Sequence, residues 1–137
     1  MLSDSVLLAL QRATHHTLHA LTTALTSLDL TASEINTLAN LADGQPRSVR
    51  ELATDTGTRS TTLTGVLDRL ERRGYVTREL DPQDRRSFRI SLTASGRAVA
   101  RKVSTAVTEL EATALAGVSA RQLAGYHAVI KALEELS

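Results

Sequence analysis

The sequence predicts a mainly α-helical fold that contains one small β-hairpin. Apolar residues recur at three- and four-residue spacing in several segments of the 137-residue chain, which is typical of helices with one buried face. Apolar and polar residues alternate only near residues 75–92, as they do in strands. Between residues 48 and 93 the predicted order is helix, turn, helix, hairpin, with further helices on both sides.

Residues 4–28 are predicted to form one long helix. Its leucines keep heptad spacing on one face, which indicates packing against a partner helix: Leu18, Leu21, Leu25 and Leu28. A second helix begins at Thr31, where Thr31 and Glu34 have the spacing of a capping box. It ends at Asp43 and Gly44, and residues 45–47 are expected to be a short connector.

The next helix begins at Ser48, which forms a second predicted capping box with Glu51. Gly57 supplies the turn that ends it, because glycine adopts positive φ without steric cost. The following helix opens near Thr58 and buries a regular apolar stripe: Leu63, Val66, Leu67 and Leu70.

The solvent-facing side of this helix carries short hydroxyl side chains and a glycine over its first two turns: Ser60, Thr61, Thr62, Thr64 and Gly65. Small groups allow a helix backbone to lie close to a partner, and a DNA major groove admits a helix. The alternative is that threonine is simply common in this chain, as it is near the start. Arginines in the next segment favour the first interpretation.

After Gly74, apolar and polar residues alternate up to the turn DPQDRR. They alternate again on the return strand, where Phe88, Ile90 and Leu92 are the apolar positions. We call this predicted two-stranded hairpin with an apolar inner face the wing. Arginines on an extended tip suit a narrow minor groove or clamping of phosphates, although a solvated turn with internal ion pairs is the alternative. The whole order is that of a winged helix-turn-helix, a fold that points to duplex DNA.

Two more helices are predicted beyond the wing. Thr93 caps the first, which runs to about residue 116 with Val99, Val103 and Leu110 on one side. Ser119 and Gln122 form a third capping box that opens the last helix. A monomer would leave the apolar stripes of the terminal helices in water, so we expect residues 1–30 and 94–137 to form a helical dimerisation region and residues 31–93 to bind DNA.

The segment 48–93 resembles the MarR family of winged-helix transcriptional regulators. The strongest marker is DPQDRRSFRISLT followed by ASG, which is similar to the family's Asp-x-Arg wing and the Leu-Thr opening of its next helix. The resemblance implies pairing of Asp84 with Arg86, dimerisation through the terminal helices, and a small aromatic or phenolic ligand in a crevice between the dimer helices and the DNA-binding region.

Composition narrows the classes of function. The net charge is only +1, but residues 43–92 contain ten arginines against eight acidic residues. DNA affinity would therefore depend on where arginines are placed and not on a general basic field. The absence of cysteine excludes disulfides and thiolate sites. No apolar run reaches the length of a membrane span, so a cytoplasmic location is expected.

We therefore predict a dimeric, sequence-specific DNA-binding regulator, a repressor, that reads an inverted repeat with half-sites about 10 bp apart. Ser60, Thr61, Thr62 and Thr64 would approach the major groove, and Arg59 and Arg69 its phosphates. Arg85 and Arg86 would reach the minor groove. Arg78 could contact a phosphate or equally pair with Glu79 or Asp81. The alternative is a winged-helix module that binds only protein.

The sequence predicts no enzyme and no cofactor, since it has neither a glycine-rich phosphate loop nor a nucleophile-and-base constellation. His15 and His19 have the i, i+4 spacing that can hold a metal ion, with His16 between them. Without a nearby acid, histidines on a helix are more often surface or dimer-contact residues, so we predict no metal site.

Overall fold

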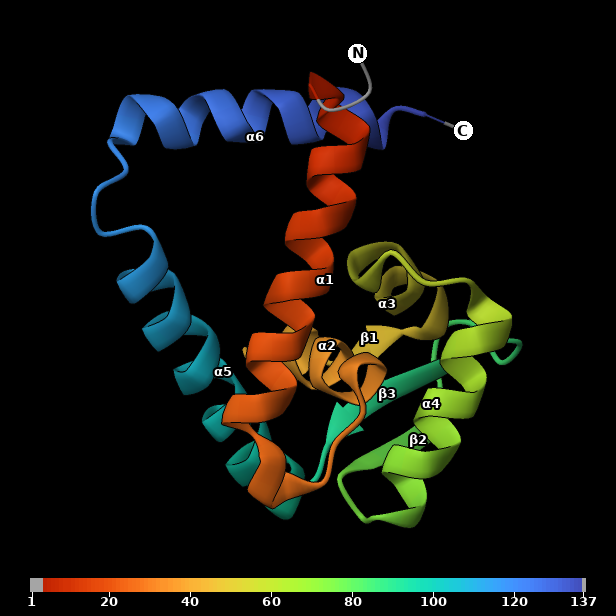
Figure 1. Ribbon diagram of the computed structural model, residues 1–137. Coiled ribbons are helices and arrows are strands. Elements are labelled where there is room, and N and C mark those ends of the chain that lie inside the picture. Colours follow the sequence, from red (N-terminus) through yellow and green to blue (C-terminus); the bar gives the residue numbers. More distant parts are fainter. Residues whose placement is uncertain (1–3, 137) are drawn as a thin grey trace. The chain divides into compact units, whose positions relative to one another are not determined.

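The computed structural model describes residues 4–136. They divide into two compact units, one up to Val107 and one from Thr108 onward. The first unit contains most of the secondary structure, in the order α1 (Val6–Ala24), the 3-10 helix η2 (Thr26–Leu28), α2 (Ala32–Leu41), β1 (Arg47–Ser48), α3 (Val49–Thr56), α4 (Ser60–Arg72), β2 (Val76–Leu80) and β3 (Phe88–Leu92) (Figure 1). Helix α5 (Ala94–Ala114) begins in the first unit and ends in the second, which also holds α6 (Ala120–Glu134).

The first predicted helix is shorter than expected. It was predicted to continue to residue 28, but α1 ends at Ala24 and a single 3-10 turn follows. The Thr26 hydroxyl donates to the carbonyl oxygens of Thr22 and Thr23, and Asp29 then adopts a left-handed conformation with φ of 51°. A tightened last turn and a left-handed residue end the helix and redirect the chain into α2.

Two of the three predicted capping boxes are confirmed. Thr31 and Glu34 exchange both hydrogen bonds at the start of α2, and Ser119 and Gln122 do so at the start of α6. At α3 only half of the box is present among the described residues, because the Ser48 hydroxyl accepts from the Glu51 amide without the return bond. Ser48 is instead the last residue of strand β1.

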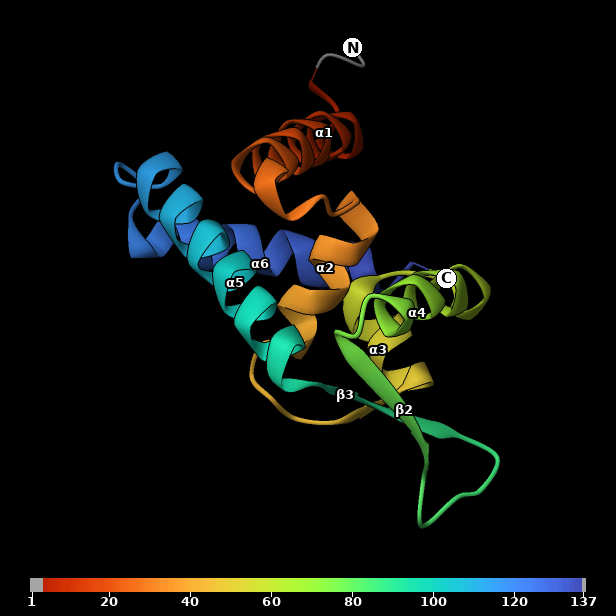
Figure 2. The same ribbon diagram turned by 90° about the horizontal axis from the view of Figure 1, so that it is seen from below.

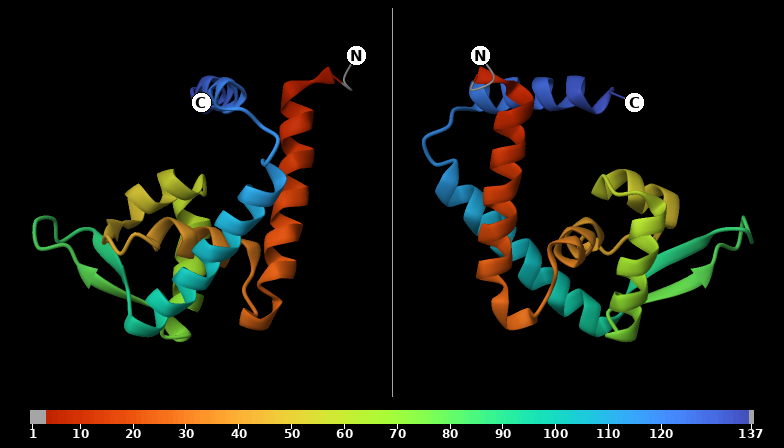
Figure 3. Two further views of the ribbon diagram at one scale, coloured as in Figure 1. Left: turned by 90° about the vertical axis from the view of Figure 1, so that its left-hand side faces the viewer. Right: turned by 45° about the vertical axis from the view of Figure 1, so that its right-hand side comes forward.

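The sheet has three antiparallel strands in the order β1, β3, β2. The prediction of two strands was therefore incomplete, since the predicted connector ends in β1, where Arg47 pairs with Ile90 and Ser48 with Arg89. Strands β2 and β3 pair from Val76 opposite Leu92 to Leu80 opposite Phe88. Figures 2 and 3 show this hairpin, the wing, extending away from α3 and α4.

The core lies where α2, α3, α4 and the sheet meet, and it includes the predicted stripe of α4. Leu63, Val66, Leu67 and Leu70 are all buried, as are Ile35, Leu38 and Leu41 of α2. Of the predicted heptad leucines, Leu25 is buried in this core and Leu21 and Leu28 pack against it, whereas Leu18 stays exposed. The C-terminal part of that leucine stripe therefore packs in the core of the same chain.

The start of α5 is fastened to the residue before β2. As predicted, Thr93 caps the helix, since its hydroxyl oxygen accepts from the Gly96 amide at 3.0 Å. The same hydroxyl donates to the Gly74 carbonyl oxygen at 2.6 Å. Gly96 lies so close to Tyr75 that a Cβ at this position would be 1.8 Å from the Tyr75 carbonyl oxygen, so only glycine fits without movement of the backbone.

The terminal helices expose several large apolar side chains. On α1 these include Val6, Leu7, Leu8 and Leu18, and near or on α6 they include Val118, Tyr126, Val129 and Leu136. Helix α5 was predicted to reach residue 116 and ends at Ala114. None of the helices in the described part of the chain has the length and apolarity needed to cross a membrane.

Candidate nucleic-acid interface

Helix α4 is positioned by a glycine turn and by its buried stripe. Gly57 ends α3 with φ of 69°, the left-handed conformation expected there. The helix was predicted to open near Thr58, but it begins at Ser60, because Thr58 and Arg59 are used in the turn and Arg59 is the extended N-cap residue. The polar face that was predicted to point outward therefore begins in the first turn of α4.

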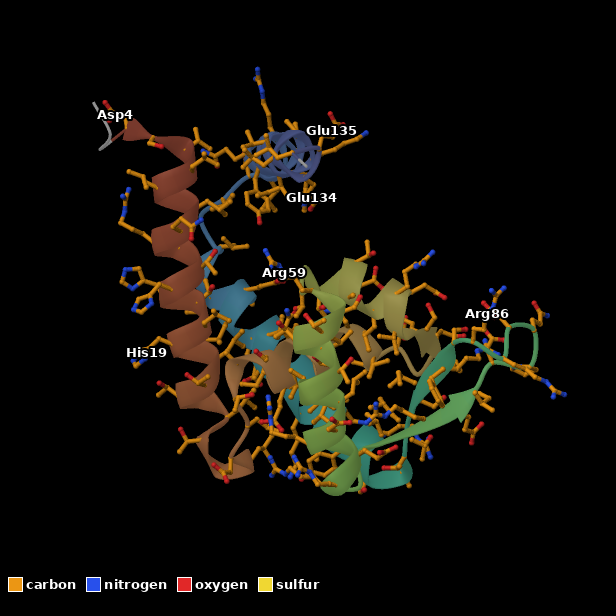
Figure 4. The ribbon with its side chains drawn as sticks, turned by 90° about the vertical axis from the view of Figure 1, so that its right-hand side faces the viewer. Asp4, His19, Arg59, Arg86, Glu134 and Glu135 are labelled. Carbon is orange, nitrogen blue, oxygen red and sulfur yellow. The ribbon has the colours of Figure 1, made fainter. Side chains whose placement is uncertain are left out.

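The predicted hydroxyl residues all lie on the exposed side of α4. Ser60, Thr61, Thr62 and Thr64 are exposed, and so are the flanking Arg59 and Arg69. A Cβ at Gly65 would have only the end of the Arg69 side chain, 3.9 Å away, as a neighbour. This face of α4 therefore carries short, exposed side chains. One arginine lies at its start, as Figure 4 shows for Arg59, and Arg69 lies further along the helix.

The wing tip is ordered by its own aspartates. Asp81 accepts a hydrogen bond from the Gln83 amide, and Asp84 accepts one from the Arg86 amide at 3.1 Å. The predicted pairing of Asp84 with Arg86 is also present, with 3.7 Å between Asp84 Oδ1 and Arg86 Nε. The Arg86 side chain nevertheless remains 96% exposed, and Arg85 is exposed beside it, so both guanidinium groups are available to a partner.

The apolar inner face of the wing is only half covered. Val76 and Ile90 are buried, but Leu80 and Phe88, which pair with each other across the strands, are 54% and 44% exposed. The predicted apolar inner face is therefore present, but its outer part is not covered, because the hairpin extends beyond the core. Phe88 instead lines an open groove between the wing and the start of α3, together with Val49, Arg50 and Arg86 among others.

Arg78 does not have either of the partners proposed from sequence. Its guanidinium binds the Asp68 carboxylate of α4 and lies 3.5 Å from Glu71 Oε1 of the same helix. The hydrogen bond to Asp68 raises the pKa of Arg78. Arg78 shares a strand face with Val76, which packs on the core, whereas Glu79 points to the other face. Arg78 therefore links the base of the wing to α4 and neutralises the carboxylates of Asp68 and Glu71 on that helix.

Arg47 is likewise held within the chain. Its Nη2 is 2.5 Å from Asp43 Oδ2, and its Nε is 3.2 Å from Asp55 Oδ2. The hydrogen bond from Arg47 lowers the pKa of Asp43 to about 2. Arg47 thus joins the end of α2, strand β1 and α3, whereas Arg50 stays exposed at the start of α3.

Arg73 is a structural arginine that no pattern in the sequence singles out. At the end of α4 it donates to the carbonyl oxygens of Leu28 at 2.9 Å and Asp29 at 2.7 Å. It also lies 3.8 Å from the buried carboxylate of Glu34 and stacks over the Tyr75 ring. The C-terminal end of α4 is thereby tied to the turn that joins α1 to α2.

The histidines of α1 are surface residues. His15, His16 and His19 are exposed, and the rings of His15 and His16 meet edge to face with centroids 6.1 Å apart. Figure 4 shows His19 on the side of α1 that faces away from α4. Within residues 4–136 no three histidine, aspartate or glutamate side chains are grouped to hold a metal ion.

The geometry of α4 and the wing can be compared with known proteins. The model of the MarR family matches residues 28–87, which include α2, α3, α4 and most of the wing. This segment is therefore similar to the MarR family. The HTH-type transcriptional regulator YcgE of Bacillus subtilis is 40% identical to it over 70 residues, which are 50% of this chain and 46% of that protein. The chain thus matches about half the length of this curated relative.

Solved structures resemble the chain over almost its whole length. CouR from Rhodococcus jostii RHA1, bound to p-coumaroyl-CoA, has a TM-score of 0.86 and 26% identity, and the likeness covers 100% of this chain and 96% of CouR. A MarR family regulator from Rhodococcus sp. RHA1 has a TM-score of 0.81 and 25% identity, with 100% and 97% covered. The predicted mainly helical winged-helix fold is confirmed by these likenesses.

Proposed function

We propose that this chain is a dimeric, sequence-specific DNA-binding transcriptional regulator of the MarR family, a repressor whose DNA binding is modulated by a small ligand. One observation carries the proposal: an open helix face of short hydroxyl side chains lies in the same unit as a projecting wing with two exposed arginines. A helix of this kind enters the major groove, while guanidinium groups bind phosphates or the narrow minor groove.

The arrangement of charge supports specific contact more than general attraction. Arg47, Arg73 and Arg78 are engaged by carboxylates or carbonyl groups of the chain itself. Arg59, Arg69, Arg85 and Arg86 are exposed on α4 and the wing. Because arginines with internal partners add little to a long-range field, the exposed ones would set the register of the protein on the duplex.

Dimerisation and ligand control are parts of the same proposal. Exposed apolar side chains on α1 and α6 would be buried by a second copy of the chain, which would also present two recognition helices to an inverted repeat. The solved relative CouR binds p-coumaroyl-CoA, which supports small-molecule control of this chain as well. Such a ligand must bind the DNA-bound and free conformations with different affinities.

Selection from a library of randomised DNA duplexes tests this function. We expect the purified chain to enrich an inverted repeat with half-site centres about 10 bp, or a multiple of that, apart. Failure to enrich any sequence would contradict specific DNA binding. It would favour a module that binds protein, for which the exposed Leu80 and Phe88 of the wing offer an apolar contact surface.

Replacement of Arg86 by alanine should weaken binding to the enriched duplex about tenfold, since one charge-assisted contact is lost. If Arg86 contacts a phosphate, the slope of log affinity against log salt should also fall by about one. Titration by fluorescence anisotropy at several salt concentrations measures both quantities. Arg101→Ala removes the same charge from the exposed side of α5 and should change neither. Unchanged binding of Arg86→Ala would remove the wing from the interface.

A further inference from the structure

The outward stripe of α4 contains very few groups that can form paired hydrogen bonds with bases. Thr61, Gly65 and Asp68 follow each other at spacings of four and three residues, opposite the buried stripe that contains Leu63 and Leu67. Between residues 60 and 67 there is no arginine, lysine, asparagine or glutamine. Those are the residue types that bind guanine or adenine through two hydrogen bonds.

Part of the remaining hydrogen-bonding capacity is used inside the helix. The Thr64 hydroxyl donates to the Ser60 carbonyl oxygen at 2.9 Å. A threonine has one hydroxyl proton, so Thr64 offers a partner only its methyl group and oxygen lone pairs. Asp68, the next outward polar residue, is bound through Oδ1 by Arg78, so part of its accepting capacity is already used.

The methyl groups of threonine are therefore the most abundant contact groups on this face. Thr61, Thr62 and Thr64 are exposed, and Gly65 leaves space for the helix backbone to approach. In the major groove the only apolar group on a base edge is the C5 methyl of thymine, and threonine methyl groups are among its usual contacts.

We propose that α4 recognises thymine C5 methyl groups in the major groove through the methyl groups of Thr61, Thr62 and Thr64. This inference rests on the proposed DNA-binding function. It specifies the class of half-site, which has thymines at the base pairs that α4 contacts. Arginines at the edge of the helix and on the wing would position the protein, and the threonines would discriminate between sequences.

Substitution of deoxyuridine for thymidine in the selected duplex tests the proposal from the DNA side. Uracil keeps the Watson–Crick pairing and the minor-groove oxygen of thymine and lacks only the C5 methyl group. Each substitution under α4 should weaken binding about three- to fivefold, the size expected for one methyl group removed from a buried contact. Substitutions in the flanks reached by the wing should have no effect, since the minor groove carries no methyl group.

Threonine variants test the same contact from the protein side. Serine variants remove the methyl group and keep the hydroxyl: Thr61→Ser, Thr62→Ser and Thr64→Ser. The corresponding valine variants keep the methyl group and remove the hydroxyl. The serine variant at a contacting position should bind the thymidine duplex about three- to fivefold more weakly than the wild type. It should bind the deoxyuridine duplex as well as the wild type does. The valine variant should keep its preference for thymidine. Thr105→Ser, on the exposed side of α5, is the matched control.

The outcomes separate this inference from the proposed function. If the chain binds the selected duplex specifically and deoxyuridine substitution under α4 changes nothing, thymine recognition is overturned and DNA binding stands. Loss of the thymidine preference in the valine variants would also overturn it, since hydroxyl groups would then be the reading groups. If no duplex is bound specifically, the proposed function itself fails.

Discussion

Gly96→Ala is expected to destabilise the first unit by about 3 kcal/mol, toward the upper end of the range for overpacking a tight site. The new Cβ would lie 1.8 Å from the Tyr75 carbonyl oxygen and 2.8 Å from its carbonyl carbon. Both are backbone atoms, so no side chain can rotate to relieve the clash. The Tyr75 carbonyl also accepts a hydrogen bond from the Thr93 amide at 3.0 Å, and the separation that alanine requires would break this bond.

Urea denaturation followed by circular dichroism measures the effect, with all proteins at one concentration because dimerisation would shift the midpoint. Gly125→Ala is the control. It also lies within a helix, a Cβ there meets no atom within 4 Å, and alanine is favoured over glycine by up to about 1 kcal/mol in a helix. A Gly96→Ala midpoint equal to that of the wild type would contradict the close packing of α5 on Tyr75.

Arg78→Ala should weaken DNA binding about thirtyfold, or about 2 kcal/mol, through the like charges it would leave facing the phosphates. Asp68 and Glu71 would lose their partner, and both lie on α4, beside the face proposed to enter the groove. Their side chains are 51% and 46% exposed, so the ion pairs themselves contribute little to folding. The variant should therefore stay folded, and the loss should appear in DNA affinity.

The triple variant Arg78→Ala, Asp68→Asn, Glu71→Gln distinguishes neutralisation from phosphate contact. If Arg78 acts by neutralising the two carboxylates, the triple variant should recover most of the affinity measured by anisotropy at low salt. If Arg78 contacts a phosphate, as the sequence alone allowed, the triple variant should stay as weak as Arg78→Ala. Asp68→Asn with Glu71→Gln in the presence of Arg78 is the control for the amide substitutions.

The features that were predicted correctly depend on residues close in sequence. A capping box joins two residues three positions apart, so Thr31 with Glu34 and Ser119 with Gln122 could be identified from the sequence alone. The buried stripe of α4 follows from helical periodicity over a few turns. The exposure of the hydroxyl residues on its opposite face then follows from the same periodicity.

The features that were missed depend on tertiary contacts. Strand β1 has only two residues and exists because β3 offers it an edge. Arg73 meets Glu34, a residue 39 positions earlier, through the packing of α4 on the turn before α2. For Arg78 a signal was available, since strand alternation places Arg78 and Glu79 on opposite faces and directs Arg78 toward α4. The choice of partner still required the position of α4.

Sequence-specific DNA binding by α4 and the wing is tested by a competition titration of the selected duplex against random duplex at two salt concentrations. We expect saturable binding that random duplex displaces only in at least about thousandfold excess, with affinity that falls as salt rises. Equal binding of selected and random duplex at both salt concentrations would contradict the claim that α4 and the wing read a DNA sequence.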